Sequence, residues 1–235
     1  YGGANIDLQV RGLRKGAQIV VGTPGRTVDL IKRRVLNLET IKWVVLDEAD
    51  EMLNMGFKDE LDRILEATPS DKQTLLFSAT FPKEVDAIAR NYMNNSFEIS
   101  AGNKNISTVN VKHHAYIVEE KNRYSALKRI TDFNPDIYGI VFCRTREETK
   151  TVAEKLIADG YSADALHGDL SQQQRDMVMQ KFRTKHLQLL IATDVAARGL
   201  DVTDLTHVIN YKIPDQYEAY THRSGRTGRA GKEGI

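Results

Sequence analysis

The chain alternates short apolar runs rich in β-branched residues with stretches of helical periodicity, and this alternation limits the possible folds more than any other feature. The apolar runs are residues 19–21, 41–46, 74–77 and 97–99 and, after a polar stretch at 100–110, residues 111–118, 137–143, 163–166, 187–192 and 207–211. Helical patterns such as 146–159 and 172–182 lie between them. Strands that alternate with helices predict parallel sheets covered by helices. We therefore predict an α/β protein with two parallel-sheet units in tandem.

Composition agrees with globular domains and excludes some partners. With 235 residues, 41% hydrophobic and 28% charged, the chain has room for one large or two medium cores. No apolar run approaches the ~20 residues that span a bilayer, so we expect no membrane partner. The lone cysteine, Cys143, cannot form an internal disulfide, which predicts a reducing, cytoplasmic location. A net charge of only +1 means that any phosphate binding must be local.

One apolar run ends abruptly in acids, at Asp47-Glu48-Ala49-Asp50. Magnesium prefers oxygen ligands and keeps several waters, so a carboxylate at a strand end can hold it through water while it bridges nucleotide phosphates. Asp47 is thus the candidate metal-side group, and Glu48 is placed to orient or deprotonate an attacking water. The alternative is a buried strand with a polar end, and the run alone does not decide between the two.

The usual partner of such a strand is a glycine-rich loop that ends in Gly-Lys-Ser or Gly-Lys-Thr and cradles phosphates. The sequence has no such loop, and Gly231-Lys232-Glu233 lacks the hydroxyl. The chain also begins at Tyr1 and ends at Ile235, just after a glycine-rich turn. We therefore expect an internal fragment of a longer protein, called the parent protein below.

Polar residues also follow other predicted strands, where ligands of parallel sheets bind. Thr23-Pro24-Gly25-Arg26 offers amides, a hydroxyl and a guanidinium that suit a phosphodiester backbone, although an ordinary Pro-Gly turn is the alternative. The hydroxyls of Ser78 and Thr80 are candidates to bond the Asp50 carboxylate.

Two further runs lie in the second half of the chain. Thr193 to Asp201 mixes small residues with acids that can accept from sugar hydroxyls, and the alternative is a helix start with an Asp cap. His222 to Arg229 holds three arginines and two glycines. Arginine suits a phosphate whose charge grows in the transition state, whereas a solvated basic turn is the alternative.

Taken together in order, these motifs resemble those of the DEAD-box RNA helicases of superfamily 2 over essentially the full chain. The matching residues are Gly2-Gly3, Thr23 to Arg26, Asp47 to Asp50, Ser78 to Thr80, Val141 to Thr145, Gln172 with Arg175, Ala192 to Asp201 and His222 to Arg229. The resemblance implies two RecA-like domains, both truncated here. Residues 1–102 would belong to the first domain, 103–110 to a linker and 111–235 to the second domain, with the phosphate loop upstream of Tyr1.

The resemblance also implies residue roles. Asp47 becomes the Mg²⁺-side acid, Glu48 positions the hydrolytic water, and Arg226 and Arg229 become arginine fingers. The nucleotide side further includes Asp50, Ser78, Thr80, Gly199, Asp201 and His222, with Asp201 meeting the ribose and Asp50 linking to Ser78, Thr80 and His222. The RNA side includes Gly3, Thr23, Arg26, Arg144, Gly168, Arg175 and Thr193, and Gly199 also borders it.

The implied activity is that of an ATP- and Mg²⁺-dependent RNA helicase. It would hold single-stranded RNA by its backbone, with little sequence preference, and separate short duplexes when ATP closes the two domains. Two other hypotheses remain: an RNA clamp or annealing factor that uses ATP only as a switch, and a non-catalytic binding piece. Because the phosphate loop is missing, we expect the isolated 235 residues to be inactive.

Overall fold

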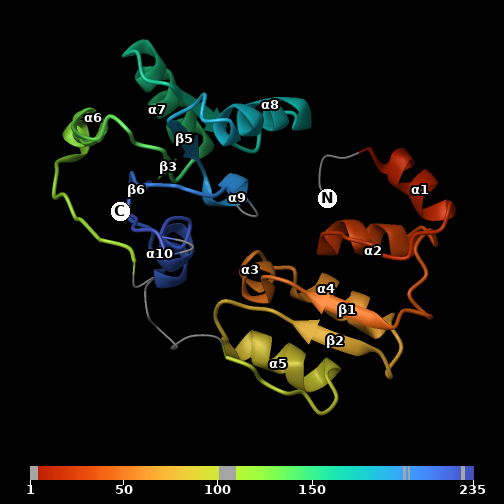
Figure 1. Ribbon diagram of the computed structural model, residues 1–235. Coiled ribbons are helices and arrows are strands. Elements are labelled where there is room, and N and C mark those ends of the chain that lie inside the picture. The colour runs from red at the N-terminus through yellow and green to blue at the C-terminus, as the bar shows by residue number, and fades with distance from the viewer. Residues whose placement is uncertain (1–4, 101–109, 198–199, 201, 229–230) are drawn as a thin grey trace. The chain divides into compact units, whose positions relative to one another are not determined.

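The computed structural model describes residues 5–100, 110–197, 200, 202–228 and 231–235. The chain divides into two compact units, Tyr1–Ser100 and Ala101–Ile235, which we call unit 1 and unit 2 (Figure 1). Most of the predicted linker at 103–110 lies outside the described residues. None of the helices in the described part of the chain is long and apolar enough to cross a membrane.

Unit 1 contains a two-stranded parallel sheet. Its elements are α1 (Ile6–Arg14), α2 (Pro24–Lys32), β1 (Trp43–Leu46), α3 (Ala49–Asn54), α4 (Lys58–Glu66), β2 (Gln73–Leu76) and α5 (Lys83–Tyr92). Val44 and Leu46 of β1 point into a core that α3, α4 and α5 complete. On the other face of β1, Trp43 and Val45 are 59% and 56% exposed. The described part of the chain thus buries one face of this sheet.

Unit 2 contains a four-stranded parallel sheet in the order β4-β5-β3-β6. Its elements are η1 (Glu120–Asn122), α6 (Arg123–Phe133), β3 (Gly139–Phe142), α7 (Arg146–Ala158), β4 (Ala163–Leu166), α8 (Gln172–Arg183), β5 (Leu189–Ala192), α9 (Asp194–Ala197), β6 (His207–Asn210) and α10 (Tyr217–Ser224).

Helices cover both faces of the unit 2 sheet. Ile140 and Phe142 of β3 lie in a core that includes residues of α8 and α9. Val141 and Cys143, which alternate with them, lie in a second core that includes residues of α6 and α7. Every residue of β3 and β5 is buried. This confirms the prediction of an α/β protein with parallel sheets.

Local sequence signals explain where α7 and α8 begin. Ser171 caps α8 in a capping box, because its hydroxyl accepts from the Gln174 amide while the Gln174 side chain accepts from the Ser171 amide. Thr145 caps α7 by accepting from the Glu148 amide at 3.1 Å. Both caps place a helix directly after a turn that leaves the sheet.

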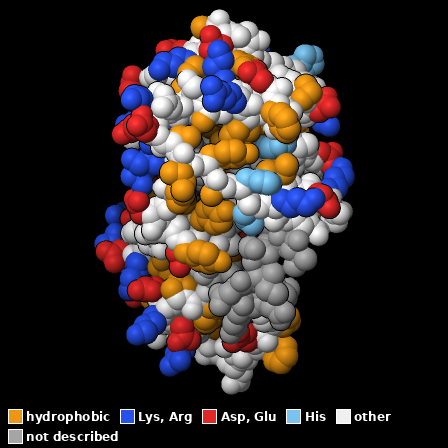
Figure 2. Space-filling view, turned by 90° about the vertical axis from the view of Figure 1, so that its left-hand side faces the viewer, with side chains coloured by type: hydrophobic (Ala, Val, Ile, Leu, Met, Phe, Trp, Pro, Cys, Tyr) orange, Lys and Arg blue, Asp and Glu red, His pale blue; other side chains and the backbone are white. Residues whose placement is uncertain are grey.

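Three predicted strands are wrong. Residues 19–21 and 97–99 form no strand, and of 111–118 only Val111 makes an isolated bridge, to Gly234. Their apolar side chains are therefore exposed, Ile117 completely. Figure 2 shows exposed hydrophobic side chains, with histidines beside them, on the face that it draws. A β-branched run becomes a strand only where a neighbouring strand supplies hydrogen-bond partners.

Candidate functional site

The acidic turn of unit 1 leaves the sheet at the carboxyl end of β1. Asp47 and Glu48 follow Leu46 directly, and both are exposed. Glu48 adopts the left-handed conformation, with φ 52° and ψ 48°, and its amide donates to the Asp47 carboxylate at 3.0 Å. Non-glycine residues rarely adopt this conformation, and where they do, it often marks a functional turn. The turn directs two adjacent carboxylates away from the core.

Asp50 fastens this turn to the next strand. Its buried carboxylate accepts from the Thr80 amide at 2.8 Å and from the Thr80 hydroxyl at 2.7 Å. The Ser78 hydroxyl instead accepts from the Asp50 amide at 3.2 Å and donates to the Thr80 carbonyl at 2.6 Å. The expectation that both hydroxyls reach the carboxylate is therefore corrected for Ser78, because its hydroxyl bonds backbone groups.

The exposed acids suit magnesium better than a metal held in a protein cage. Among the described residues, no group of three or more His, Cys, Asp or Glu side chains is arranged to hold a metal ion. Magnesium usually takes one or two carboxylates and completes its shell with water and substrate phosphates. Asp47, exposed at the strand end, fits that pattern.

Thr23 and Arg26 lie at the start of α2 rather than in a separate turn. Pro24 is the first helical residue, and the Thr23 hydroxyl makes no capping hydrogen bond. The amides of the first helical turn therefore point out of the helix, as at many anion sites. Arg26 donates to the Gln9 side chain on α1 at 2.6 Å. The Pro-Gly pair thus begins a helix, and Thr23 and Gly25 are exposed at its start.

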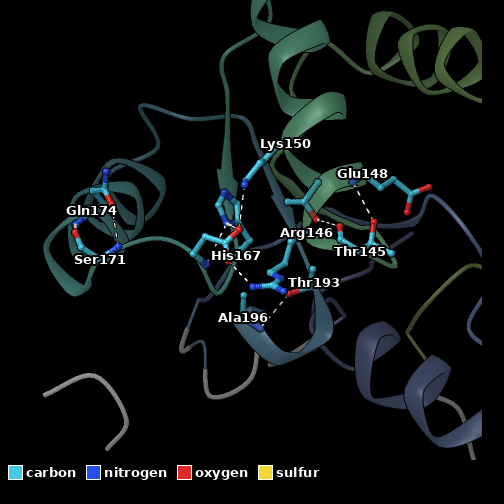
Figure 3. A network of polar contacts seen from close by, with 11 residues as sticks. Thr145, Arg146, Glu148, Lys150, His167, Ser171, Gln174, Thr193 and Ala196 are labelled. Atoms are coloured by element: carbon cyan, nitrogen blue, oxygen red, sulfur yellow. Dashed lines mark hydrogen bonds and ion pairs between the residues drawn. The ribbon is translucent and has the colours of Figure 1, made fainter.

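In unit 2, the predicted RNA residues follow three parallel strands. Arg144, Gly168 and Thr193 come after β3, β4 and β5, which are neighbours in the sheet, so they lie at its carboxyl edge. Figure 3 shows Thr193 there, beside Ala196. Arg175 on α8 reaches the same region, since its guanidinium donates to the Ala196 carbonyl at 3.4 Å. Thr193 is buried, and its hydroxyl accepts from the Ala196 amide at 3.4 Å. Arg144 pairs instead with Asp215 at 2.6 Å.

Arg223 is a buried residue whose role the sequence did not reveal. Its guanidinium donates to both carboxylate oxygens of Asp194, at 2.6 and 2.7 Å, and to the Asn210 side chain at 2.7 Å. It also stacks over the Phe142 ring, 5.0 Å from its centroid. The pair joins α10 to α9, so Asp194 serves as an ion-pair partner rather than as a helix cap. An arginine-rich sequence does not indicate which arginine is buried.

The remaining predicted residues in unit 2 are partly described. The Arg226 guanidinium donates to the Leu200 carbonyl at 3.2 Å, and His222 is half-buried on α10. Gly3, Gly199, Asp201 and Arg229 lie outside the described residues.

Cys143 is not a reactive group. It is fully buried beside β3, and this burial raises the pKa of its thiol to about 12. A thiol with so high a pKa is protonated near neutral pH and serves as a packing residue.

Comparisons with known proteins agree with this geometry. A sequence model of the DEAD/DEAH box helicases matches residues 1–88, and one of the helicase conserved C-terminal domain matches residues 122–231. The DEAD-box ATP-dependent RNA helicase CshA of Geobacillus kaustophilus is 46% identical over 235 residues, which are 100% of this chain and 50% of that protein. The chain thus spans about half the length of the curated relatives it matches.

Solved structures give the same result. Dbp5 of S. cerevisiae bound to RNA and ADP BeF3 is 33% identical with a TM-score of 0.80, over 93% of this chain and 58% of that one. A hypothetical ATP-dependent RNA helicase from Sulfolobus tokodaii is 38% identical with a TM-score of 0.52, over 100% of this chain and 68% of that one. With its two parallel α/β units of RecA-like fold and its matches along the whole length, the chain belongs to the DEAD-box family of ATP-dependent RNA helicases.

Proposed function

We propose that the parent protein is an ATP-dependent RNA helicase that grips single-stranded RNA by its backbone and separates short duplexes. The acidic turn carries this proposal. Asp47 and Glu48 are exposed at the end of β1, while the buried carboxylate of Asp50 bonds Thr80 and so fastens the turn to the segment after β2. A turn held in this way presents two acids in a constant geometry, which a hydrolytic site requires.

In this proposal Asp47 would hold a magnesium ion through water, and Glu48 would orient the attacking water and accept its proton. Magnesium, when bound with ATP, would neutralise charge on the phosphates. Arg226 and Arg229 would stabilise the charge that grows on the transferred phosphoryl group, His222 would meet the acid network, and Asp201 and Gly199 would border the ribose.

RNA would be bound along its phosphates and 2′-hydroxyls by both units. In unit 1 the contacts would come from Gly3, from Thr23 and the amides of the first turn of α2, and from Arg26. In unit 2 they would come from Arg144, Gly168, Arg175 and Thr193. The lone buried cysteine also leads us to propose a reducing, cytoplasmic location.

Because the acids belong to unit 1 and the arginines to unit 2, we propose that hydrolysis requires the two units to close on ATP and RNA. Each ligand would favour the closed state and thereby strengthen binding of the other. RNA held bent in that state would leave the duplex, and phosphate release would reopen the units.

The substitution Glu48→Gln in the parent protein tests the proposal. It removes the proton acceptor and keeps the shape, so RNA-stimulated phosphate release should fall by at least ~100-fold while RNA and ATP binding remain. Glu66→Gln, an exposed acid at the end of α4, is the matched control. Full turnover by the Glu48→Gln variant would remove Glu48 from the mechanism.

A second test decides whether Arg226 acts in the chemical step or in RNA binding. Arg226→Ala should slow the chemical step more than it weakens RNA binding, and Arg226→Lys should restore little, since lysine lacks the planar fork. The reverse ranking would assign Arg226 to the RNA surface.

Duplex separation decides between a helicase and an ATP-switched clamp. We expect the parent protein to release the strand of a short RNA duplex in the presence of ATP. Tight nucleotide-dependent RNA binding without strand release would favour the clamp. The isolated 235 residues should show no RNA-stimulated phosphate release.

A further inference from the structure

Two basic side chains of α7 converge on one carboxylate beside the predicted RNA surface of unit 2. Lys150 donates to Asp169 at 3.0 Å, and Arg146 donates to the other oxygen of the same carboxylate. Arg146 and Lys150 are four residues apart and so share one face of the helix. Figure 3 shows both reaching toward His167, which directly follows β4.

A buried histidine holds this turn in place. His167 is 5% exposed, and its Nδ1 accepts the Asp169 amide at 3.3 Å. Burial, followed by the nearby Lys150 charge, lowers the pKa of His167, which keeps the ring neutral and able to accept. The position of the Asp169 backbone is therefore set by the core, and Gly168 is left exposed beside it.

The cluster carries more positive than negative charge. Arg146, Lys150 and Arg175 all lie near enough to His167 to lower its pKa, whereas Asp169 is the acid that acts on it in the opposite direction. Three cations against one carboxylate leave an excess of positive charge around Gly168. Such an excess attracts a phosphodiester backbone even in a chain whose overall charge is close to zero.

The two α7 side chains also have hydrogen-bond donors to spare. The Arg146 side chain is 63% exposed, and across the residues that the structure describes, Asp169 is its one ion-pair partner. A guanidinium offers five N–H groups and an ammonium offers three. An exposed ion pair contributes little to stability, so an arriving phosphate can replace the carboxylate at little cost.

We propose that Arg146 and Lys150 form a phosphodiester-binding site beside Gly168, and that Asp169 is a competing anion which occupies them until the RNA backbone arrives. This inference rests on the proposed RNA-binding function and adds a contact outside the motifs that carry the family resemblance. The site would extend the surface of Gly168, Arg175 and Thr193 along α7. Its ligand is backbone phosphate, so it would be indifferent to base sequence.

The test measures binding of a short labelled oligouridylate to the parent protein, with a non-hydrolysable ATP analogue, over a range of salt concentrations. Arg146→Ala and Lys150→Ala should each weaken binding about 3- to 10-fold and lower the slope of log affinity against log salt by about 0.7, the value for one phosphate of a single strand. Asp169→Asn should strengthen binding several-fold, because it removes the competing charge and keeps the shape.

Lys128→Ala is the matched control. Lys128 pairs with Asp159 at 2.9 Å, with side chains 36% and 37% exposed, against 37% and 40% for Lys150 and Asp169. Asp159 ends α7, whereas Lys150 lies near its start, so the control pair is far from the carboxyl edge of the sheet. Lys128→Ala should leave affinity and salt slope unchanged. Unchanged thermal unfolding would show that each variant is folded.

Two results would overturn this inference and leave the proposed function intact. If the unaltered parent protein binds the oligouridylate and both α7 variants bind like Lys128→Ala, the site does not exist. If Asp169→Asn weakens binding as Arg146→Ala does, Asp169 positions the cations and does not compete. Failure of the unaltered parent protein to bind RNA would instead overturn the proposed function.

Discussion

The two units contain sheets of the same parallel type, but their strands are buried differently. In unit 2, all four residues of β3 and of β5 are buried, because helices cover both faces. In unit 1, burial alternates along β1, and Trp43 and Val45 stay exposed. Yet the β1 sequence, Trp-Val-Val-Leu, is as apolar as that of β3, Gly-Ile-Val-Phe. An apolar run thus predicts a strand without showing how many of its faces are covered.

The apolar runs that form no strand also show that an apolar sequence does not determine how a segment is packed. Residues 19–21, Ile-Val-Val, are as apolar as β1, yet they have no strand neighbour in the described structure, and their side chains are largely exposed. A strand is stabilised by backbone hydrogen bonds to a neighbouring strand and by burial of its side chains. Both depend on residues that are distant in sequence.

The largest expected difference between the units concerns their arginine pairs. Arg223→Ala should lower the free energy of unfolding of unit 2 by about 3–5 kcal/mol, because it leaves the Asp194 carboxylate without its buried partner. In unit 1, Arg90→Ala removes an exposed pair with Asp86 at 2.8 Å and should cost at most about 0.5 kcal/mol. Hydrogen exchange of the β3 and β1 amides reports each unit separately.

Equal effects of these two substitutions would contradict the idea that the Arg223 pair is structural and the exposed Arg90 pair is not. Arg223→Lys should fall between them, since the charge is kept and the fork is lost.

The next largest difference between the units should be the cost of truncating a side chain on a strand. Leu190 on β5 is fully buried, so Leu190→Ala should cost unit 2 about 2–5 kcal/mol. Val45→Ala, on the exposed face of β1, should cost less than about 1 kcal/mol. Denaturant unfolding followed by exchange of the same amides measures both. A large loss for Val45→Ala would mean that the second face of the unit 1 sheet is covered in solution.

Mild acid should distinguish the units through histidine. All six histidines lie in unit 2, and burial lowers the pKa values of His167 and His207. As the pH falls below about 6.5, the unfolded chain binds protons that the folded unit excludes, so stability present above that pH is lost.

We expect amide exchange in β3 to speed up between pH 7 and pH 5, after correction for the intrinsic exchange rate, while exchange in β1 changes little. His167→Gln should reduce the effect in unit 2. An equal acid response in both units would assign it to carboxylates instead.

The smallest expected effect lies at the acidic turn of unit 1. Glu48→Gly should stabilise unit 1 by up to about 1 kcal/mol, because glycine adopts the left-handed conformation without strain. The same variant should lose the proposed hydrolysis. Measuring thermal unfolding and phosphate release on the same variant tests whether Glu48 is retained for activity at a cost in stability. If Glu48→Gly is instead less stable, the Glu48 side chain supports the turn.

Much of the sheet and part of the site could be predicted from sequence. Local patterns located β4 at 163–166 as the structure has it. The hydroxyls that follow β2 indicated a hydrogen bond to the Asp50 carboxylate, which Thr80 makes. Local patterns could not predict the Arg223–Asp194 ion pair, nor the ion pairs of Arg146 and Lys150 with Asp169. Each joins elements that come together only when the sheet orders its strands as β4-β5-β3-β6.

The chemical groups available at the strand ends can be read from the residue order: two adjacent acids after β1, hydroxyls after β2, and arginines around α10. These follow from residue type and from the alternation of strand and helix, which are local properties. The folded arrangement of the elements sets which charges are buried, which arginine is structural, and which carboxylate two cations share. Burial and charge pairing depend on neighbours that are distant in sequence, so no local pattern carries them.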